Sequence, residues 1–164
     1  MPEARIRQIL RSLKDHDVRF IVVGGVAAVL NGAPVNTFDI DIVPDRETAN
    51  LERLLEVLDA LDAIYRIQPH RRFKPSMSHL LSAGHQNLIT NCGNLDVLGT
   101  LGSGLTYDDL LPHTIEVAVA TDLRVQVLGL AKIIELKEEL RRDKDLATLP
   151  TLRATLKEQQ RGPG

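Results

Sequence analysis

The sequence has few of the residues that support disulfides, zinc clusters or membrane spans. Its one cysteine, Cys92, excludes an intrachain disulfide and a cysteine-based zinc cluster. We interpret Cys92 as an ordinary thiol in a turn rather than as a nucleophile. The longest apolar run, residues 20–30, is interrupted by glycines and is far too short to cross a membrane. The first residues, MPEARIRQIL, lack the apolar core of a signal peptide, so we expect a cytoplasmic protein.

Excess charge of one sign is also missing. The net charge is −2, so no general basic field is available to hold nucleic acid through its phosphates, although a local patch could serve. Apolar residues make up 43% of the 164 positions, which is sufficient for a hydrophobic core. We therefore expect one domain over residues 1–160, followed by a disordered tail at 161–164.

The apolar pattern predicts an α/β (α+β) fold, with a small mixed sheet flanked by helices and a helical C-terminal part. Residues 65–84 contain two prolines and mixed polarity, so we expect a loop there with at most one short element. Helical periodicity predicts helices at 3–14, 26–32, 45–62, 129–141 and 143–159, and a helical turn at 106–111. Runs rich in β-branched residues predict strands at 18–23, 38–43, 87–90, 95–98, 115–119 and 123–127.

The stretch FIVVGGVAAVLNGAPVNTFDIDIV, residues 20–43, contains two patterns that bear on chemistry. Gly24 and Gly25 separate a buried strand from a short helix, where backbone N–H groups can face a phosphate; a tight turn that binds nothing is the simpler alternative. Asp39 and Asp41 follow on the next strand, where residues two apart share a face. Two carboxylates on one face of an apolar strand favour a divalent cation such as magnesium, the alternative being a solvated edge strand.

Other residues could contribute to such a site. Asp96 lies in a later apolar strand and could complete a two-metal cluster and accept a proton from an attacking hydroxyl, or be an isolated strand-edge acid. Lys137 and Lys144 could reach a triphosphate, or belong to a solvated helix face. The basic loop His70–Lys74 includes Phe73 and could contact a phosphate or an RNA backbone, or be an ordinary surface loop.

These residues together resemble the signature of the nucleotidyltransferase superfamily whose founding fold is that of DNA polymerase beta. The signature consists of a Gly-Gly or Gly-Ser pair, a spacer, an acid-hydrophobic-acid strand and a third acid on a later strand. The matching residues are Gly24, Gly25, Asp39, Asp41 and Asp96.

Within this superfamily the chain is most similar to small prokaryotic toxins of the abortive-infection type. The similarity lies in Thr37, two residues before the first acid, and in a late helix with Lys137 followed by the pair Lys144-Asp145. One position departs from the pattern. Many relatives have an arginine two residues before the threonine, where this chain has Val35. That departure bears on the substrate class more than on metal binding, and Lys137, Lys144 or Arg71 could supply the missing cation.

The resemblance implies a reaction and a set of roles. A nucleoside monophosphate would move from a nucleoside triphosphate to an acceptor hydroxyl, with release of pyrophosphate. The catalytic and metal-binding residues would be Asp39, Asp41 and Asp96, with two Mg²⁺ ions as cofactors and Mn²⁺ as a substitute. The nucleotide-binding residues would be Gly24, Gly25, Thr37, Lys137 and Lys144.

The acceptor is less defined than the reaction. The resemblance implies an RNA 3′ end, a protein side chain or a small molecule such as an aminoglycoside, and a toxin–antitoxin setting with an antitoxin as partner and no membrane. A second hypothesis is a non-catalytic protein of the same fold that binds nucleotide or a partner. Val35 favours this alternative, whereas the retention of three acids argues against it.

Overall fold

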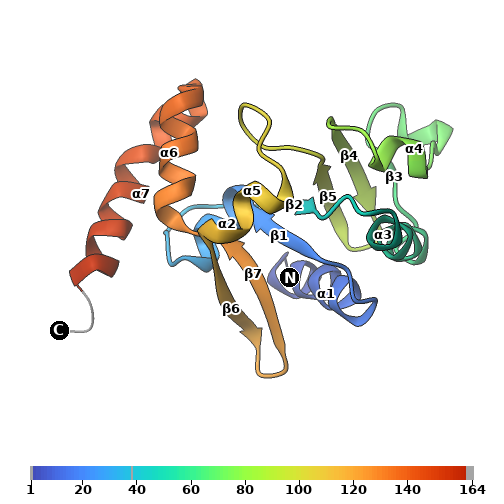
Figure 1. The fold of residues 1–164 in the computed structure, drawn as a ribbon, viewed down its shortest axis with the longest axis horizontal. Helices are drawn as coiled ribbons and strands as arrows, with labels where there is room; N and C mark the ends of the chain where they lie inside the picture. Colours follow the sequence, from blue (N-terminus) through green and yellow to red (C-terminus); the bar gives the residue numbers. More distant parts are fainter. Residues whose placement is uncertain (1, 38, 162–164) are drawn as a thin grey trace.

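The computed structural model describes residues 2–37 and 39–161 and shows a mixed α/β fold. The strands are β1 (Phe20–Val23), β2 (Ile40–Pro44), β3 (Ile64–Tyr65), β4 (His85–Thr90), β5 (Gly93–Leu98), β6 (Thr114–Ala120) and β7 (Leu123–Leu128). They form one seven-stranded sheet in the order β3-β4-β5-β2-β1-β7-β6 (Figure 1). The sheet is thus larger than expected, because β3 adds a short edge strand by pairing with β4.

The helices confirm most of the periodicity in the sequence. They are α1 (Pro2–Asp15), α2 (Gly24–Leu30), α3 (Thr48–Ala60), α4 (Met77–Leu80), α5 (Tyr107–Leu110), α6 (Leu130–Leu140) and α7 (Asp143–Arg161), with 3₁₀ turns η1 (Pro69–Arg71) and η2 (Leu111–His113). The expectation of at most one short element in residues 65–84 is wrong. This segment holds the end of β3, η1 and α4, because β4 offers an edge for pairing and Ser76 caps α4.

The sheet register brings the ends of three central strands together. β1 runs antiparallel to β2, with Val23 opposite Asp41. β2 in turn runs parallel to β5, with Asp41 opposite Asp96. The start of α2, which follows β1 directly, therefore lies beside the acidic part of β2.

The core explains why β1 reads as an unbroken apolar run. All four residues of β1 are buried, as expected for a strand covered on both faces. α1 contributes Ile9, Leu10 and Leu13 to this core, and α3 contributes a leucine stripe that includes Leu51 and Leu54. α6 and α7 pack as a helical hairpin at one end of the molecule (Figure 1).

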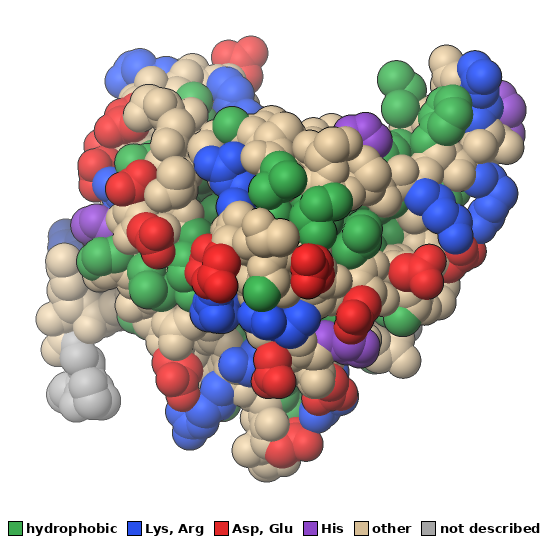
Figure 2. Space-filling view, turned by 45° about the vertical axis from the view of Figure 1, so that its right-hand side comes forward, with side chains coloured by type: hydrophobic (Ala, Val, Ile, Leu, Met, Phe, Trp, Pro, Cys, Tyr) green, Lys and Arg blue, Asp and Glu red, His purple; other side chains and the backbone are tan. Residues whose placement is uncertain are grey.

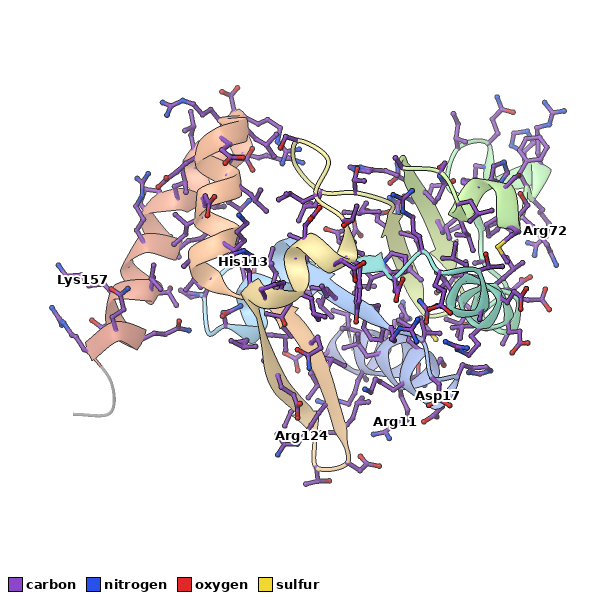
Figure 3. The ribbon with its side chains drawn as sticks, in the orientation of Figure 1. Arg11, Asp17, Arg72, His113, Arg124 and Lys157 are labelled. Atoms are coloured by element: carbon purple, nitrogen blue, oxygen red, sulfur yellow. The ribbon has the colours of Figure 1, made fainter. Side chains whose placement is uncertain are left out.

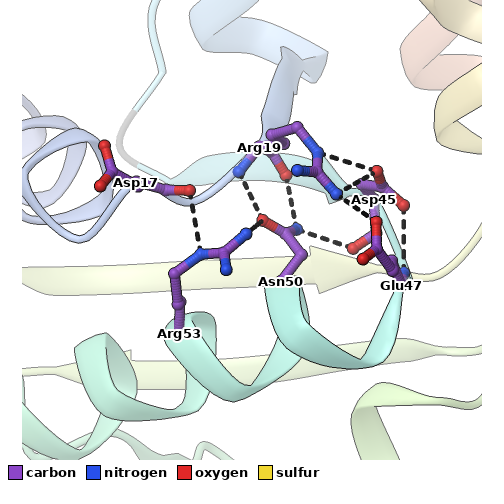
Figure 4. Close-up of polar contacts among 6 residues, drawn as sticks. All are labelled: Asp17, Arg19, Asp45, Glu47, Asn50 and Arg53. Atoms are coloured by element: carbon purple, nitrogen blue, oxygen red, sulfur yellow. Dashed lines mark hydrogen bonds and ion pairs between the residues drawn. The ribbon is translucent and has the colours of Figure 1, made fainter.

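A buried asparagine joins α3 to both central strands. The amide oxygen of Asn50 accepts a hydrogen bond from the Arg19 backbone at 2.7 Å (Figure 4). Its amide nitrogen donates to the carbonyls of Arg19 and Asp45 at 3.0 and 2.7 Å. Arg19 immediately precedes β1 and Asp45 immediately follows β2, so this one side chain fixes the end of the strand pair opposite to the acids. The Asp45 carboxylate also accepts from the Glu47 backbone, which delays the start of α3 to Thr48.

Three remaining expectations concern the membrane, Phe38 and the tail. Within the described ranges, no helix combines the length and the apolar character that a membrane crossing needs. Phe38, which we expected at the start of the second strand, lies outside the described residues. Arg161, expected in the tail, ends α7, and residues 162–164 lie outside the described residues.

Candidate functional site

The predicted carboxylates lie along neighbouring strands at the centre of the sheet. Asp41 of β2 and Asp96 of β5 are direct partners, so their side chains stand side by side on one face. Asp39 lies just before β2, and its carboxylate accepts a hydrogen bond from the side-chain amide of Asn94 at 3.0 Å. Asn94 is itself two residues before Asp96 on β5, so the same face carries all four polar side chains.

The electrostatics of Asp41 reflect this crowding. Burial raises the pKa of Asp41 to about 7, and the Asp96 and Asp39 carboxylates act in the same direction, whereas Arg66 opposes them. A carboxylate that is difficult to ionise because of burial and like charges is stabilised by a nearby cation. The central part of the site therefore has the electrostatic character of a cation-binding site.

Arg66 is a cation in the site that the sequence pattern did not indicate. Its guanidinium forms an ion pair with Asp96 and donates to the carbonyl of Leu88 at 2.9 Å. Arg66 directly follows β3, whose residue Ile64 pairs with Ile89 of β4, and β4 pairs with β5. Residues two apart share a face, so Arg66 continues the face of Ile64 and extends across β4 to Asp96.

A cleft of about 380 Å³ opens over Asp41 and Asp96. His85 and Asn87 of β4 line the same wall as the acids. Arg142 and Lys144, from the corner between α6 and α7, line the cleft as well. The cleft thus combines carboxylates from the sheet with cations from the helical hairpin. His85 and Asn87 were missed in the sequence, although their alternation along a strand next to Asp96 is a signal that could have found them.

The glycine pair is required by close contacts with two other predicted residues. Gly24 has φ +69°, and a Cβ at this position would lie 2.1 Å from a carboxylate oxygen of Asp41. A Cβ on Gly25 would lie 2.7 Å from the hydroxyl oxygen of Thr37. The Thr37 hydroxyl donates to the carbonyl of Asp39 at 3.2 Å. Gly24 lines the cleft, whereas Gly25 and Thr37 pack against each other and support the segment that carries Asp39.

The two predicted lysines have different surroundings. Lys144 lines the cleft, whereas Lys137 donates to the buried carboxylate of Asp145 at 3.2 Å. Arg142 donates to the same carboxylate at 2.6 Å. Burial alone would raise the pKa of Asp145, but the hydrogen bonds from Arg142 and Lys137 outweigh burial and lower that pKa to about 2. Asp145 therefore organises the corner from which Arg142 and Lys144 line the cleft.

The basic loop His70–Lys74 lies apart from the acids. Arg72 pairs with Asp62 at 2.8 Å, and Lys74 lies 3.7 Å from Asp59. Figure 3 shows Arg72 on the side of the molecule opposite to Lys157 of α7. Val35, at the position where many relatives have arginine, packs against the core. The cations near the acids are therefore Arg66, which pairs with Asp96, and Arg142 and Lys144, which line the cleft.

The acids of the site offer the kind of ligand atoms that a divalent cation needs. Carboxylate oxygens are the ligands that magnesium prefers, and the register places those of Asp41 and Asp96 side by side. Nevertheless, no three acidic, histidine or cysteine side chains in residues 2–37 and 39–161 are arranged to hold one ion. Hydrogen bonds hold Asp96 and Asp39 to Arg66 and Asn94 instead. The residues fit the chemistry of the cation, and these side chains must move for all three acids to share it.

The fold is shared with a solved structure. It is similar to the crystal structure of a Thermotoga maritima protein described as a "putative nucleotidyltransferase", with a TM-score of 0.56. The two chains are 21% identical, and the match covers 93% of this chain and 91% of the other. The sequence matches no family model and no curated protein. The likeness confirms the expected fold class, a mixed α/β sheet with flanking helices.

Proposed function

We propose that the protein is a nucleotidyltransferase that moves a nucleoside monophosphate from a nucleoside triphosphate to an acceptor hydroxyl. The observation that carries this proposal is the cleft that Asp41 and Asp96 share with Arg142 and Lys144. Paired carboxylates suit a divalent cation, and basic side chains suit the triphosphate that such a cation accompanies. The fold shared with the Thermotoga maritima protein supports the same reaction class.

In the proposed reaction, the acceptor oxygen forms a bond to the α-phosphorus of the nucleotide. The bond between the α-phosphorus and the oxygen that bridges it to the β-phosphorus breaks, and pyrophosphate leaves with that oxygen. Asp96 would take the proton of the acceptor hydroxyl. Lys144 and Arg142 would bind the triphosphate from the other side of the cleft and offset the charge on the leaving pyrophosphate.

Magnesium is the proposed cofactor, held by Asp41 and Asp96 with Asp39 as the third carboxylate. Bound there, it would stabilise the negative charge on the reacting phosphate oxygens. Gly24 would lie beside the triphosphate, because its backbone contacts Asp41 and lines the cleft. Two ions with Mn²⁺ as a substitute, and nucleotide contacts from Gly25, Thr37 and Lys137, remain predictions.

The acceptor that we propose is an RNA 3′ end or a protein hydroxyl. On the face shown in Figure 2, Lys and Arg side chains are interspersed with Asp and Glu, so a short local contact suits this surface better than a long RNA duplex. A toxin-type role with an antitoxin partner is part of this proposal and stays a prediction.

The direct test uses each of the four nucleoside triphosphates, labelled at the α-phosphate, with Mg²⁺ and a cell lysate. We expect one of them to label RNA or protein, and Asp41→Ala and Asp96→Asn to lower this labelling at least a hundredfold. Asp122→Asn is the control, because Asp122 pairs with Arg11 at the surface and does not line the cleft. If the wild type binds a nucleotide but transfers none of the four, the non-catalytic alternative replaces the enzyme.

A further inference from the structure

Arg66 is a positively charged residue that contacts Asp96, one of the acids of the site. We infer that Arg66 is a built-in counter-ion of Asp96, and that it competes with a divalent cation for this carboxylate. The inference rests on the proposed cation site and deepens it. It assigns the control of metal affinity to Arg66, a residue outside the family signature.

The contacts of Arg66 fix its position. Its backbone N–H donates to the carbonyl of Asn87 at 3.1 Å, and its guanidinium donates to the carbonyl of Leu88 at 2.9 Å. The same guanidinium pairs with one carboxylate oxygen of Asp96. The Arg66 side chain is 27% exposed and that of Asp96 is 16% exposed. An ion pair that is mostly shielded from solvent is screened less by salt than a surface pair.

Arg66 is also the cation that is paired with the acid cluster. In the described part of the chain, no ion pair reaches Asp39 or Asp41. Arg142, which lines the same cleft, is paired with Asp145. Among the ion pairs of the described residues, that of Arg66 is therefore the one that directly neutralises an acid of this cluster.

Competition follows from charge and from ligand geometry. A divalent cation bound to Asp96 would lie within a few ångströms of the guanidinium, and like charges at that distance repel strongly in a half-buried site. In addition, Arg66 occupies a lone-pair site on one carboxylate oxygen of Asp96, which leaves fewer sites for a metal ion while the ion pair persists.

Arg66 could have the opposite effect and strengthen metal binding, and that outcome would contradict the inference. Carboxylates that bind metals are often oriented by hydrogen bonds from residues behind them, and removal of such a residue weakens metal binding. If Arg66 only orients Asp96, its replacement would lower metal affinity. If Arg66 competes, its replacement would increase metal affinity. The sign of the change therefore decides between the two roles.

The test compares Mn²⁺ binding to the wild type and to Arg66→Gln, measured by the electron paramagnetic resonance of free Mn²⁺. Glutamine keeps an amide N–H for the Leu88 carbonyl but removes the charge. We expect the dissociation constant for Mn²⁺ to fall at least tenfold. The matched control is Arg72→Gln in the neighbouring loop, because Arg72 pairs with Asp62 rather than with a site acid. This control should bind Mn²⁺ like the wild type. An unchanged or weaker affinity in Arg66→Gln overturns the inference.

A second measurement uses the folded wild type, in case Arg66→Gln is unstable. Mg²⁺ titration followed by NMR should shift the guanidinium ¹⁵Nε resonance of Arg66, because its pairing with Asp96 is disturbed, while that of Arg72 stays in place. A stationary Arg66 resonance at saturating Mg²⁺ overturns the inference. Neither measurement uses catalysis. A protein that follows both expectations but transfers no nucleotide keeps the inference and loses the proposed function, whereas a transferring enzyme with equal Mn²⁺ affinity in both forms does the reverse.

Discussion

Asp41 and Asp96 stand side by side on the parallel strands β2 and β5, although they are far apart in the chain. Asp41 contacts the backbone of Gly24 on one side and neighbours Asp96 on the other, and Arg66 pairs with Asp96 from the edge of the sheet. The site is therefore a row of contacts that runs from β1 to β3 across five neighbouring strands, rather than a single motif. The effect of removing each contact in this row can be measured separately.

The raised pKa of Asp41 predicts an unusual pH dependence of stability in EDTA. The pKa of Asp41 is about 7 in the folded protein and about 4 in the unfolded chain, so the folded state binds more protons between these values. The free energy of unfolding should therefore fall as pH rises from 4 to 7, by at most about 4 kcal/mol, and change no further above that range on account of Asp41.

This pH effect is measured by urea unfolding of the wild type and Asp41→Asn at several pH values. Asp41→Asn has no carboxyl group to ionise at this position, so it should be the more stable of the two at pH 8 and lack this part of the slope. Parallel curves for the two proteins would show that Asp41 ionises at an ordinary pH.

Gly24→Ala should be more destabilising than Gly32→Ala. Both glycines have positive φ, +69° and +95°, so each alanine carries a backbone cost of about 1–2 kcal/mol. At Gly32 a Cβ has no neighbour within 4 Å, whereas at Gly24 it collides with the Asp41 carboxylate. We expect Gly24→Ala to cost about 1–3 kcal/mol more, measured by chemical unfolding. The excess should shrink in an Asp41→Ala background, and an equal cost for both glycines would contradict the contact.

Asp145→Asn should destabilise the corner between α6 and α7. It should also reduce the fall in the free energy of unfolding at acidic pH. The pKa of Asp145 is lowered to about 2, so its ionised form stabilises the fold above about pH 4, and this contribution disappears as pH falls from 4 to 2. A loss of about 2 kcal/mol at pH 7 is expected, since a shift of one pKa unit corresponds to about 1.4 kcal/mol. Asp122→Asn, at an exposed pair, should cost less than about 1 kcal/mol. Similar losses for both variants would remove the special role of Asp145.

Lys144→Ala should mainly lower nucleotide affinity, whereas Lys137→Ala should mainly lower stability. Lys144 lines the cleft, so its removal should weaken nucleoside triphosphate binding about tenfold, with the melting temperature nearly unchanged. Lys137 pairs with buried Asp145, so its removal should lower stability by about 1–2 kcal/mol and affect nucleotide binding less. Isothermal titration and thermal unfolding of both variants separate these effects. Equal losses of nucleotide affinity would place both lysines at the ligand.

The acids and glycines could be predicted from the sequence because their signals are local. Period-two spacing places Asp39 and Asp41 on one face, and a glycine pair between strand and helix indicates close backbone contact. Which acids meet depends on the sheet order, which no local pattern contains. For the same reason, the sequence did not indicate Arg66. β3 has only two residues, too few to show an alternation of apolar and polar side chains.

The lysines illustrate a second limit of sequence patterns. Lys137 and Lys144 look equivalent, as basic residues in a charged helical region. The structure separates them, because Lys137 and Arg142 both pair with buried Asp145. One of the two predicted cations, Lys137, is therefore already paired within the protein. Burial of a single polar side chain depends on how α6 and α7 pack, and packing is a tertiary property that residue types alone do not determine.

The parallel pairing of β2 with β5 also has a kinetic consequence. The connection between them runs through α3, β3, η1, α4 and β4, so a long segment must be in place before Asp41 and Asp96 meet. Such distant pairings form late when the loop-closure entropy is large, and here they also bring like charges together. A cation that binds these acids would then find its ligands only in the nearly native chain. Divalent ions should accordingly slow unfolding while leaving the folding rate almost unchanged.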